Sequence, residues 1–170
     1  MIFPLRIHMN DAYLSIGSNV NNRSNNIKMC LDLLHEHDLS IIDISSIYET
    51  EPIGYKKQKY FYNIVAHIKT LTDIYNLFNI TREIEIKMGR NIKQTKNYPR
   101  IIDIDILTYA NKIIESKDLT IPHPRLHNRK FVLIPWCEIN SEFYIPKYNK
   151  SVSTLLKNVK DVSKVCKLNI

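Results

Sequence analysis

The sequence predicts an α+β fold with an antiparallel sheet, a ferredoxin-like βαββαβ sandwich with a C-terminal extension. The order of the predicted elements, β-α-β-β-α-β up to residue 110, is the first observation that supports it. A content of 44% hydrophobic residues in a chain of 170 is enough for the core of one domain. The sequence also lacks linkers, repeats and low-complexity tracts. We therefore expect an N-terminal extension at residues 1–10 and a single domain at residues 11–170.

Four strands and two helices account for the chain up to residue 110. Short apolar runs that end at glycine, proline or polar residues predict the strands, at residues 12–17, 39–50, 61–70 and 100–110. Apolar residues at helical spacing predict the helices, at residues 26–37 and 71–88. In this antiparallel sheet we expect both helices on one face and the other face free to hold a site.

The remainder of the chain forms the C-terminal extension. We expect a short hairpin through residues 111–112 and a largely irregular stretch at residues 119–129, which contains two prolines. Residues 130–140 are predicted to form a helix with Pro135 near its start. A short strand around residues 143–145 and a final amphipathic helix complete the prediction.

Composition excludes several classes of protein. No apolar run approaches the roughly 20 residues of a membrane span, and the N-terminus lacks the features of a signal peptide. The thiols of Cys30, Cys137 and Cys166 are isolated, without the C-x-x-C spacing of a zinc site, and they do not suggest a disulfide framework. We therefore expect a reduced, cytoplasmic protein. With three glycines, the chain cannot build a glycine-rich phosphate-binding loop.

Two acids on one predicted strand are the most informative feature. In NYPRIIDIDI, residues 97–106, Asp103 and Asp105 are two positions apart, so their side chains share one face of the strand. Carboxylates about 7 Å apart suit a pair of Mg²⁺ ions, which also remove the repulsion between the acids. For D-x-D alone, two solvated acids on an edge strand are the better interpretation.

The cations around this strand change that balance. The residues before the acids supply Arg90, Lys93, Lys96 and Arg100, and the irregular stretch after them supplies further basic residues, namely His123, Arg125, His127, Arg129 and Lys130. Arginine suits bidentate contact with phosphate, and lysine acts there as a point charge. Acids for metal flanked by cations for phosphate are typical of a phosphoryl-transfer site.

Two further sets of residues are open to more than one interpretation. Glu85, just before the basic loop, could hold a loop cation or a substrate group, or lie on the helix surface. Phe61 and Phe131 could sandwich a flat heterocycle, with the Asn63 amide bonded to its edge, or the two rings could belong to the core. The residues alone do not decide between these alternatives.

Several motifs resemble one known family in order and spacing. YPRIIDIDI resembles the P-R-x-x-D-x-D-I core of 6-hydroxymethyl-7,8-dihydropterin pyrophosphokinase, an enzyme of the folate pathway. LTIPHPRLHNRKFVLIPWCEI resembles that family's L-T-x-P-H…N-R-x-F-x-x-x-P-x-x-E-I segment. Shorter matches are YLSIGSN, YETEPIG, NIVAHIKT and IEIKMGR. Together they extend from residue 13 to about residue 146, and the two longer motifs are highly specific.

The resemblance implies a fold, a reaction and a set of roles. The family has a ferredoxin-like fold in three αβα layers, and it transfers pyrophosphate from ATP to 6-hydroxymethyl-7,8-dihydropterin, releasing AMP. By resemblance, two Mg²⁺ ions would be bound by Asp103 and Asp105, and the phosphates would be contacted by Arg90, Lys96, Arg100, His123 and Arg129. The adenine and ribose would lie near Glu85, Ile106, Leu119 and Thr120. The pterin would be surrounded by Thr50, Ile53, Phe61, Asn63 and Phe131, with the Phe131 ring stacked on it.

Four positions depart from the family pattern. Asn97 stands where the family often has a tryptophan that closes over the pterin, and Lys96 precedes it in place of arginine. Ile92 stands where a second loop arginine is frequent, and Pro124 follows His123 in place of an aromatic residue. We therefore expect weaker closure of the loop at residues 89–99.

Two rival functions are consistent with parts of this pattern. A nucleotidyltransferase also uses paired strand acids with Mg²⁺, but it releases pyrophosphate and not AMP. The net charge of +7 indicates either an anionic partner or a lysine-rich solvated surface, and charge alone favours the surface. A nucleic-acid-binding module is disfavoured because paired acids on the sheet would repel a phosphate backbone. We expect a monomer that binds ATP and the pterin, with neither nucleic acid nor membrane as a partner.

Overall fold

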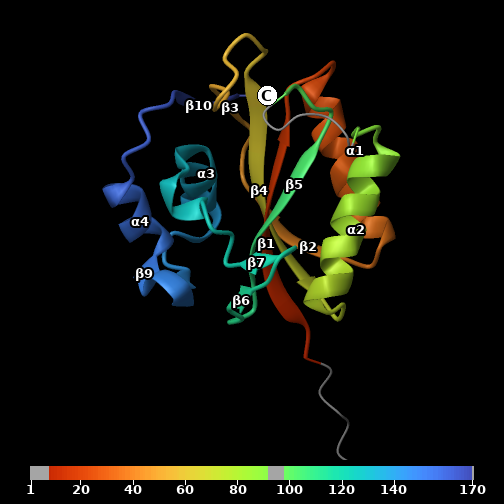
Figure 1. The fold of residues 1–170 in the computed structure, drawn as a ribbon, viewed down its shortest axis with the longest axis vertical. Helices are drawn as coiled ribbons and strands as arrows, with labels where there is room; N and C mark the ends of the chain where they lie inside the picture. The colour runs from red at the N-terminus through yellow and green to blue at the C-terminus, as the bar shows by residue number, and fades with distance from the viewer. Residues whose placement is uncertain (1–7, 92–97, 170) are drawn as a thin grey trace, which may run out of the picture.

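The computed structural model describes residues 8–91 and 98–169. The predictions for Ile92, Lys93, Lys96 and Asn97 lie outside the described residues, as does most of the predicted extension at residues 1–10. Three layers are visible in Figure 1, with α1 (Arg23–Glu36) and α2 (Ile74–Lys87) on one face of the main sheet and α3 (Lys130–Asn140) and α4 (Val152–Asn158) on the other. The candidate functional site lies at one end of these layers, where several strands and helices begin or end.

The first half of the chain supplies most of the main sheet and two of the helices. Its elements are β1 (Asn10–Ser18), α1 (Arg23–Glu36), β2 (Ser40–Ile44), β3 (Tyr48–Thr50), β4 (Phe61–Thr70), α2 (Ile74–Lys87) and β5 (Asp103–Tyr109). Asn22 and Asp73 cap the two helices, because each side chain accepts a hydrogen bond from a backbone N–H of the first turn. The predicted strand at 61–70 is confirmed with both ends, and the predicted strand at 12–17 and helices at 26–37 and 71–88 are confirmed with shifted ends.

The second half adds shorter elements. They are β6 (Ile114–Glu115), β7 (Thr120–Ile121), η1 (Leu126–Asn128), α3 (Lys130–Asn140), β8 (Tyr144–Ile145), η2 (Pro146–Tyr148), β9 (Lys150–Ser151), α4 (Val152–Asn158) and β10 (Val165–Lys167). The predicted helices of the extension are confirmed as α3 and α4. Pro135 lies in the middle of α3 and not near its start, which corrects that prediction.

The sheet places the two acids on β5, the last strand of its order, beside β1. Its order is β10-β3-β4-β1-β5, with β2 also paired to β4, and every pairing is antiparallel. In the register of β1 and β5, Asp103 pairs with Gly17 and Asp105 pairs with Ser15. An α+β fold with a six-stranded antiparallel sheet and four α-helices among the described residues is therefore confirmed.

Two predicted strands differ from the structure. The segment 39–50 is two strands, and the first ends before Ser45. The Ser45 N–H donates to the Val65 carbonyl at 2.9 Å, but its hydroxyl, in place of its backbone carbonyl, accepts from the Val65 N–H at 3.0 Å. The hairpin expected at residues 111–112 is a turn after β5, and the nearby hairpin pairs β6 with β7. The three-residue strand β10 was not predicted.

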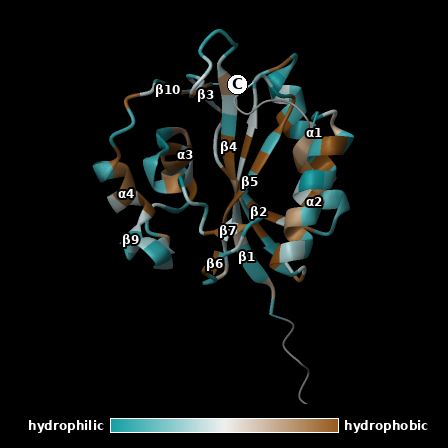
Figure 2. Cartoon of the chain, in the orientation of Figure 1, coloured by the Kyte–Doolittle hydropathy of each residue, from teal (hydrophilic) through white to brown (hydrophobic). Residues whose placement is uncertain are grey.

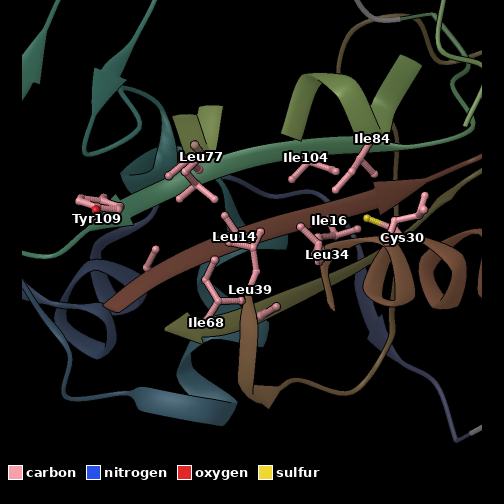
Figure 3. Packing of buried hydrophobic residues seen from close by; sticks show 14 of the residues in the cluster. Leu14, Ile16, Cys30, Leu34, Leu39, Ile68, Leu77, Ile84, Ile104 and Tyr109 are labelled. Atoms are coloured by element: carbon pink, nitrogen blue, oxygen red, sulfur yellow. The ribbon is translucent and has the colours of Figure 1, made fainter. Parts of the chain in front are cut away.

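Two hydrophobic cores hold the layers together. Leu14 and Ile16 of β1 pack with α1 and α2, whereas Tyr13 of the same strand packs with α3 through Trp136. Figure 2 shows hydrophobic stretches along the sheet and in the helices that cover it. Figure 3 shows the first core, where side chains from β1, α1, α2 and β5 meet. Alternate residues of one strand thus serve opposite faces.

Helices cover both faces of the sheet, which corrects the expectation that one face is free. The helix α3 packs on the second face through Val132 and Leu133, and α4 packs on α3 with Val152 in the same core; all three side chains are fully buried. They leave uncovered the end of this face where β1 finishes and β4 and β5 begin. That end is the place where a site can form.

Candidate active site

A cavity of about 710 Å³ opens at this end of the sheet. The end of β1, the starts of β4 and β5, the end of α2 and the start of α3 all contribute to its walls. Ile104 and Ile106 of β5 point into the first core, so the alternating acids Asp103 and Asp105 point to the opposite face, toward the α3 layer. The structure therefore brings the predicted acids to a cavity.

Arginines hold both acids. The Nη1 atom of Arg100 lies 2.9 Å from Oδ2 of Asp103, and the Nη1 atom of Arg90 lies 2.9 Å from Oδ1 of the same carboxylate. The Nη1 atom of Arg129 lies 2.9 Å from Oδ2 of Asp105. These three cations come from the end of α2, the residues before β5 and the start of α3. Charge attraction thus joins three separate segments at the two acids.

The turn that ends α2 explains the position of Arg90. Gly89 has φ +94°, and its N–H donates to the Ile86 carbonyl, while the N–H of Arg90 donates to the Glu85 carbonyl. This pair of bonds is a Schellman motif, in which glycine adopts the left-handed conformation at low cost. The motif turns the chain back, and the Arg90 guanidinium reaches both the Glu85 and the Asp103 carboxylates.

Glu85 lies at the junction of α2 and β5. Its side chain is only 10% exposed, and Oε1 accepts hydrogen bonds from the Ile104 N–H at 2.8 Å and from the Arg90 guanidinium. Burial raises the pKa of Glu85 to about 7, although Arg90 and the Ile104 N–H both act to lower this pKa. The carboxyl group therefore titrates near neutral pH while it holds the start of β5 against α2.

His123 faces the second acid. Its ring Nε2 lies 3.7 Å from Oδ2 of Asp105, and its backbone N–H donates to the Leu107 carbonyl of β5. Burial lowers the pKa of His123 to about 4 against the opposing effect of Asp105, with Arg129 and Arg125 lowering it further. The Nδ1 atom accepts from the Arg125 N–H at 3.2 Å, so the proton of the neutral ring is on Nε2, toward Asp105.

The donor set fits Mg²⁺ ions that also bind phosphate. Asp103 and Asp105 supply hard carboxylate oxygens on one strand face, and Mg²⁺ is commonly held by one or two carboxylates with the remaining ligands from phosphate and water. Among the described residues, no group of three or more His, Cys, Asp and Glu side chains could hold a metal ion by itself. The site thus fits a metal that arrives with a phosphate ligand.

A second cavity of about 250 Å³ adjoins the first. Ile104, Asp105 and Phe78 line both cavities, so the two meet beside the second acid. The residues predicted for adenine, together with His123, line the second cavity, namely Ile106, Leu119 and Thr120. A ligand with a flat base and a phosphate chain can therefore extend from this cavity past the acids into the larger one.

All the residues predicted for the pterin line the larger cavity, namely Thr50, Ile53, Phe61, Asn63 and Phe131. The Asn63 amide is buried and donates from Nδ2 to the Thr50 hydroxyl at 2.7 Å. Gly17 makes room for it, because a Cβ at Gly17 would lie 2.4 Å from the Asn63 Oδ1 atom. The predicted pterin residues thus bring a hydrogen-bonded amide and two aromatic side chains to one cavity.

Some residues at the cavity were not predicted as site residues. Gly17, Gln58, Arg82, Tyr98 and Arg125 all line it. Gly17 lies in the motif YLSIGSN, and Arg125 lies in the basic stretch after β5. The sequence, however, gives no reason to place Gly17 beside Asn63.

Asn19 is a further residue that sequence reasoning missed. It is 2% exposed, and it joins the segment before β5 to the loop between β3 and β4. Its Oδ1 accepts from the Arg100 N–H at 2.8 Å, and its Nδ2 donates to the Gln58 side chain at 2.8 Å. Its partners are 39 and 81 residues away, which no local pattern reveals.

Comparison with known proteins decides the family. The model of the 7,8-dihydro-6-hydroxymethylpterin-pyrophosphokinase (HPPK) family matches residues 13–141. The chain belongs to this family. It is therefore a dihydropterin pyrophosphokinase, an enzyme of folate biosynthesis that uses ATP.

Individual relatives agree with this family. The 2-amino-4-hydroxy-6-hydroxymethyldihydropteridine pyrophosphokinase of Bacillus subtilis is 40% identical over 131 residues, which are 76% of this chain and 78% of that protein. The protein of the same name from Haemophilus influenzae is 34% identical over 159 residues, 93% of this chain and 98% of that protein.

A solved structure supports the fold. The crystal structure of wild-type Plasmodium falciparum HPPK-DHPS superposes with a TM-score of 0.69 at 18% identity. It covers 89% of this chain and 45% of that chain, so the present chain spans less than half of that protein. Within the described ranges 8–91 and 98–169, no helix is both long enough and apolar enough to cross a membrane.

Proposed function

We propose that the two cavities bind the two substrates of the family reaction, with the acids between them. Adenine occupies the smaller cavity beside Ile106, Leu119 and Thr120, and the triphosphate passes Asp105 and Asp103. The pterin occupies the far end of the larger cavity, where the Asn63 amide can bind the ring edge. Thr50, Ile53, Phe61 and Phe131 surround the ring there. This is one continuous path from nucleotide to acceptor.

The two acids carry the proposed metal site. We infer that Asp103 and Asp105 bind two Mg²⁺ ions together with ATP, as the carboxylate pair and its arginine neighbours support. When bound, the ions would neutralise phosphate charge and stabilise the transition state of transfer. The acids' own part is to fix the phosphates at one place on β5.

We propose that the arginines exchange the acids for phosphate oxygens when ATP and metal bind. In the free protein Arg90, Arg100 and Arg129 neutralise the acids, which would otherwise repel each other across one strand face. When the acids bind metal, the guanidinium groups become available to phosphate oxygens, for which their planar donors are well suited. His123 can donate its Nε2 proton to phosphate in the same way. Lys96, outside the described residues, is proposed to add a further cation.

The transfer itself needs orientation and exclusion of water. The pterin hydroxymethyl oxygen bonds to the β-phosphorus of ATP, and the bond from that phosphorus to the oxygen shared with the α-phosphorus breaks. AMP leaves with the electron pair of that bond, and the hydroxyl proton is released. Residues that hold the two substrates in line lower the entropic part of the barrier, and a closed cavity keeps water from competing as acceptor. Glu85 supports this arrangement by holding α2 to β5.

The broader organisation is also proposed. We infer a ferredoxin-like βαββαβ sandwich with a C-terminal extension, formed as one domain over residues 11–170, because β1, β4 and β5 have the strand order of that sandwich. We further propose a cytoplasmic monomer without a nucleic-acid or membrane partner. The carboxylates in the cavity support the first exclusion, since they would repel a phosphate backbone.

The pair of acids carries the proposal, because Asp103 lines the larger cavity and Asp105 lines both cavities. The test is to incubate the protein with ATP, Mg²⁺ and 6-hydroxymethyl-7,8-dihydropterin and to identify the nucleotide product. We expect AMP in amounts equal to the pterin diphosphate. Release of pyrophosphate, or of ADP, would contradict transfer of the pyrophosphoryl group.

A further inference from the structure

Two tyrosines meet at the larger cavity without a role in the proposal above. Tyr55 lies in the loop between β3 and β4, and Tyr98 lies in the segment before β5. Their ring centroids are 5.4 Å apart with an interplanar angle of 9°, so the rings are stacked. They are 43% and 44% exposed, which places the pair at the surface and not in either core.

Tyr98 also borders the space proposed for the pterin. It lines the larger cavity together with Ile53, Phe61 and Phe131. An exposed aromatic pair that spans two separate segments contributes little to a core. It can, however, hold the two segments together at the edge of a ligand cavity.

The backbone around both tyrosines is fixed. The carbonyl of Tyr55 accepts from the Gln58 side chain at 2.6 Å, and the carbonyl of Tyr98 accepts from Nε of Arg100 at 3.3 Å. Asn19 links Gln58 to the Arg100 backbone, so the two segments are already joined at their bases. The stacked rings of Tyr55 and Tyr98 add a second contact between these two segments, nearer the surface.

We propose that Tyr55 and Tyr98 form an aromatic clasp that holds the pterin in its end of the cavity. It acts by keeping the loop of Tyr55 and the segment of Tyr98 together around a flat heterocycle. The inference rests on the proposed pterin end of the cavity.

The test measures binding of 6-hydroxymethyl-7,8-dihydropterin and, separately, of a non-hydrolysable ATP analogue with Mg²⁺. Tyr98→Ala and Tyr55→Ala should each weaken pterin binding about 3- to 10-fold, the range that an aromatic pair supplies. Binding of the ATP analogue should change less than 2-fold. Tyr98→Phe and Tyr55→Phe keep the stacked rings and should bind pterin as the unmodified protein does.

A double-mutant cycle tests whether the rings act as a unit. The double variant Tyr55→Ala/Tyr98→Ala should bind pterin no more weakly than the worse single variant, because either change already removes the stack. Losses that multiply would contradict a clasp. Tyr75→Ala is the matched control, since Tyr75 is 56% exposed on α2 and does not line the cavity. It should change neither affinity.

Failure of the clasp and failure of the pterin assignment give different results. If Phe131→Ala weakens pterin binding and Tyr98→Ala does not, the pterin site stands and the clasp is wrong. If neither variant weakens pterin binding, the proposed pterin end is itself wrong. An equal loss of pterin and ATP analogue in Tyr98→Ala would also overturn the clasp, because it would indicate general damage to the site. Tyr98→Leu, which keeps an apolar side chain, repeats the test if the alanine variant folds poorly.

Discussion

The two ends of the active-site cavity are built in opposite ways. At the phosphate end, Asp103 and Asp105 are held by arginines, and every one of these contacts is an ion pair between partly exposed groups. At the pterin end, Asn63 and Thr50 are 4% and 1% exposed and are joined by a hydrogen bond. In the proposed function, the first end neutralises its charges until the substrate replaces them, whereas the second holds its donors in place before the substrate arrives.

This difference has an energetic reason. Ion pairs that water can reach contribute little to stability, so exchanging one partner for another costs little. A buried amide that loses its partner costs considerably more, because water does not replace the lost bond. We therefore expect changes at the phosphate end to affect turnover and metal binding, and changes at the pterin end to affect one ligand's affinity.

The largest effect is expected at the acids. Asp103→Ala or Asp105→Ala should lower kcat on the order of 10³-fold or more, because each change removes a ligand of the metal that stabilises the transferred phosphates. Circular dichroism should show an unchanged fold, since both side chains lie at the cavity and not in a core. Asp32→Ala, an exposed acid on α1, is the control. Turnover near the normal rate in either variant would refute the two-metal proposal.

Arg129→Ala is expected to have two smaller effects of opposite sign, one on the affinity for the ATP analogue and one on the affinity for Mg²⁺. Arg129→Ala should weaken binding of the ATP analogue about 10- to 100-fold, the size of a lost charge-assisted hydrogen bond. The same change should tighten binding of Mg²⁺ without nucleotide, because Asp105 then lacks the guanidinium that competes with the metal. Isothermal titration calorimetry measures both affinities.

Arg82→Ala is the matched control for Arg129. Arg82 lines the same cavity, but among the described contacts its guanidinium lies over Phe78 and not on an acid. It should leave the affinity for Mg²⁺ alone unchanged. If Arg129→Ala weakened the binding of Mg²⁺ alone, the arginine would assist the metal site and the proposed exchange of partners would be wrong.

At the pterin end a single methyl group should be enough to lower affinity. Gly17→Ala places a Cβ 2.4 Å from the Asn63 Oδ1 atom, so the amide must move. We expect roughly 10-fold weaker pterin binding, comparable to the loss of one buried hydrogen bond, with the affinity for the ATP analogue unchanged. Asn63→Ala should show the same selectivity, whereas Thr50→Ser keeps the hydroxyl that accepts from Asn63 and should be nearly neutral. Equal losses for both ligands would contradict the assignment.

The last prediction concerns the pH dependence of stability, and not turnover or ligand binding. The pKa of Glu85 is raised by burial to about 7 in the folded protein, from an ordinary value of 4.5. The folded state therefore retains a proton that the unfolded state loses, and this contribution to stability falls as the pH rises from about 4.5 to about 7. The free energy lost over this range is about 3 kcal/mol.

The comparison with Glu85→Gln isolates this contribution. His123 acts with the opposite sign, because burial lowers its pKa to about 4 and its contribution to stability grows as the pH rises to its unfolded value. His123 contributes equally in the unmodified protein and in Glu85→Gln, so its contribution cancels in the difference between their free energies of unfolding. Urea unfolding of the metal-free proteins at several pH values should show that the advantage of the unmodified protein decreases between pH 4.5 and 7. A constant difference would mean that Glu85 is charged throughout.

The sequence predicted the parts of the fold that depend on local patterns. The strand at 61–70 and the helix at 71–88 follow from alternation, helical spacing and the Asp73 cap. The break at Ser45 was not predictable, because it depends on Val65 in another strand. The three residues of β10 are too few for any pattern, and they form a strand only because β3 offers a free edge.

For the site, motifs located the residues but not their partners. D-x-D showed that Asp103 and Asp105 share a face, which the register confirms. That Arg90 lies between Glu85 and Asp103 depends on the Schellman motif that ends α2 and on the packing of α2 beside β5. The reason for Gly17 is the Asn63 side chain on the neighbouring strand. Such long-range contacts are fixed by packing and leave no local pattern in the sequence.

A crystal structure of the complex with Mg²⁺ and a non-hydrolysable ATP analogue tests the central claim most directly. We predict that the Arg129–Asp105 ion pair, 2.9 Å in the free protein, is broken, with Asp105 on the metal and Arg129 on phosphate. The Asn63–Thr50 hydrogen bond, 2.7 Å in the free protein, should be unchanged. A complex in which Arg129 remains on Asp105, with no metal bound to that acid, would contradict the account.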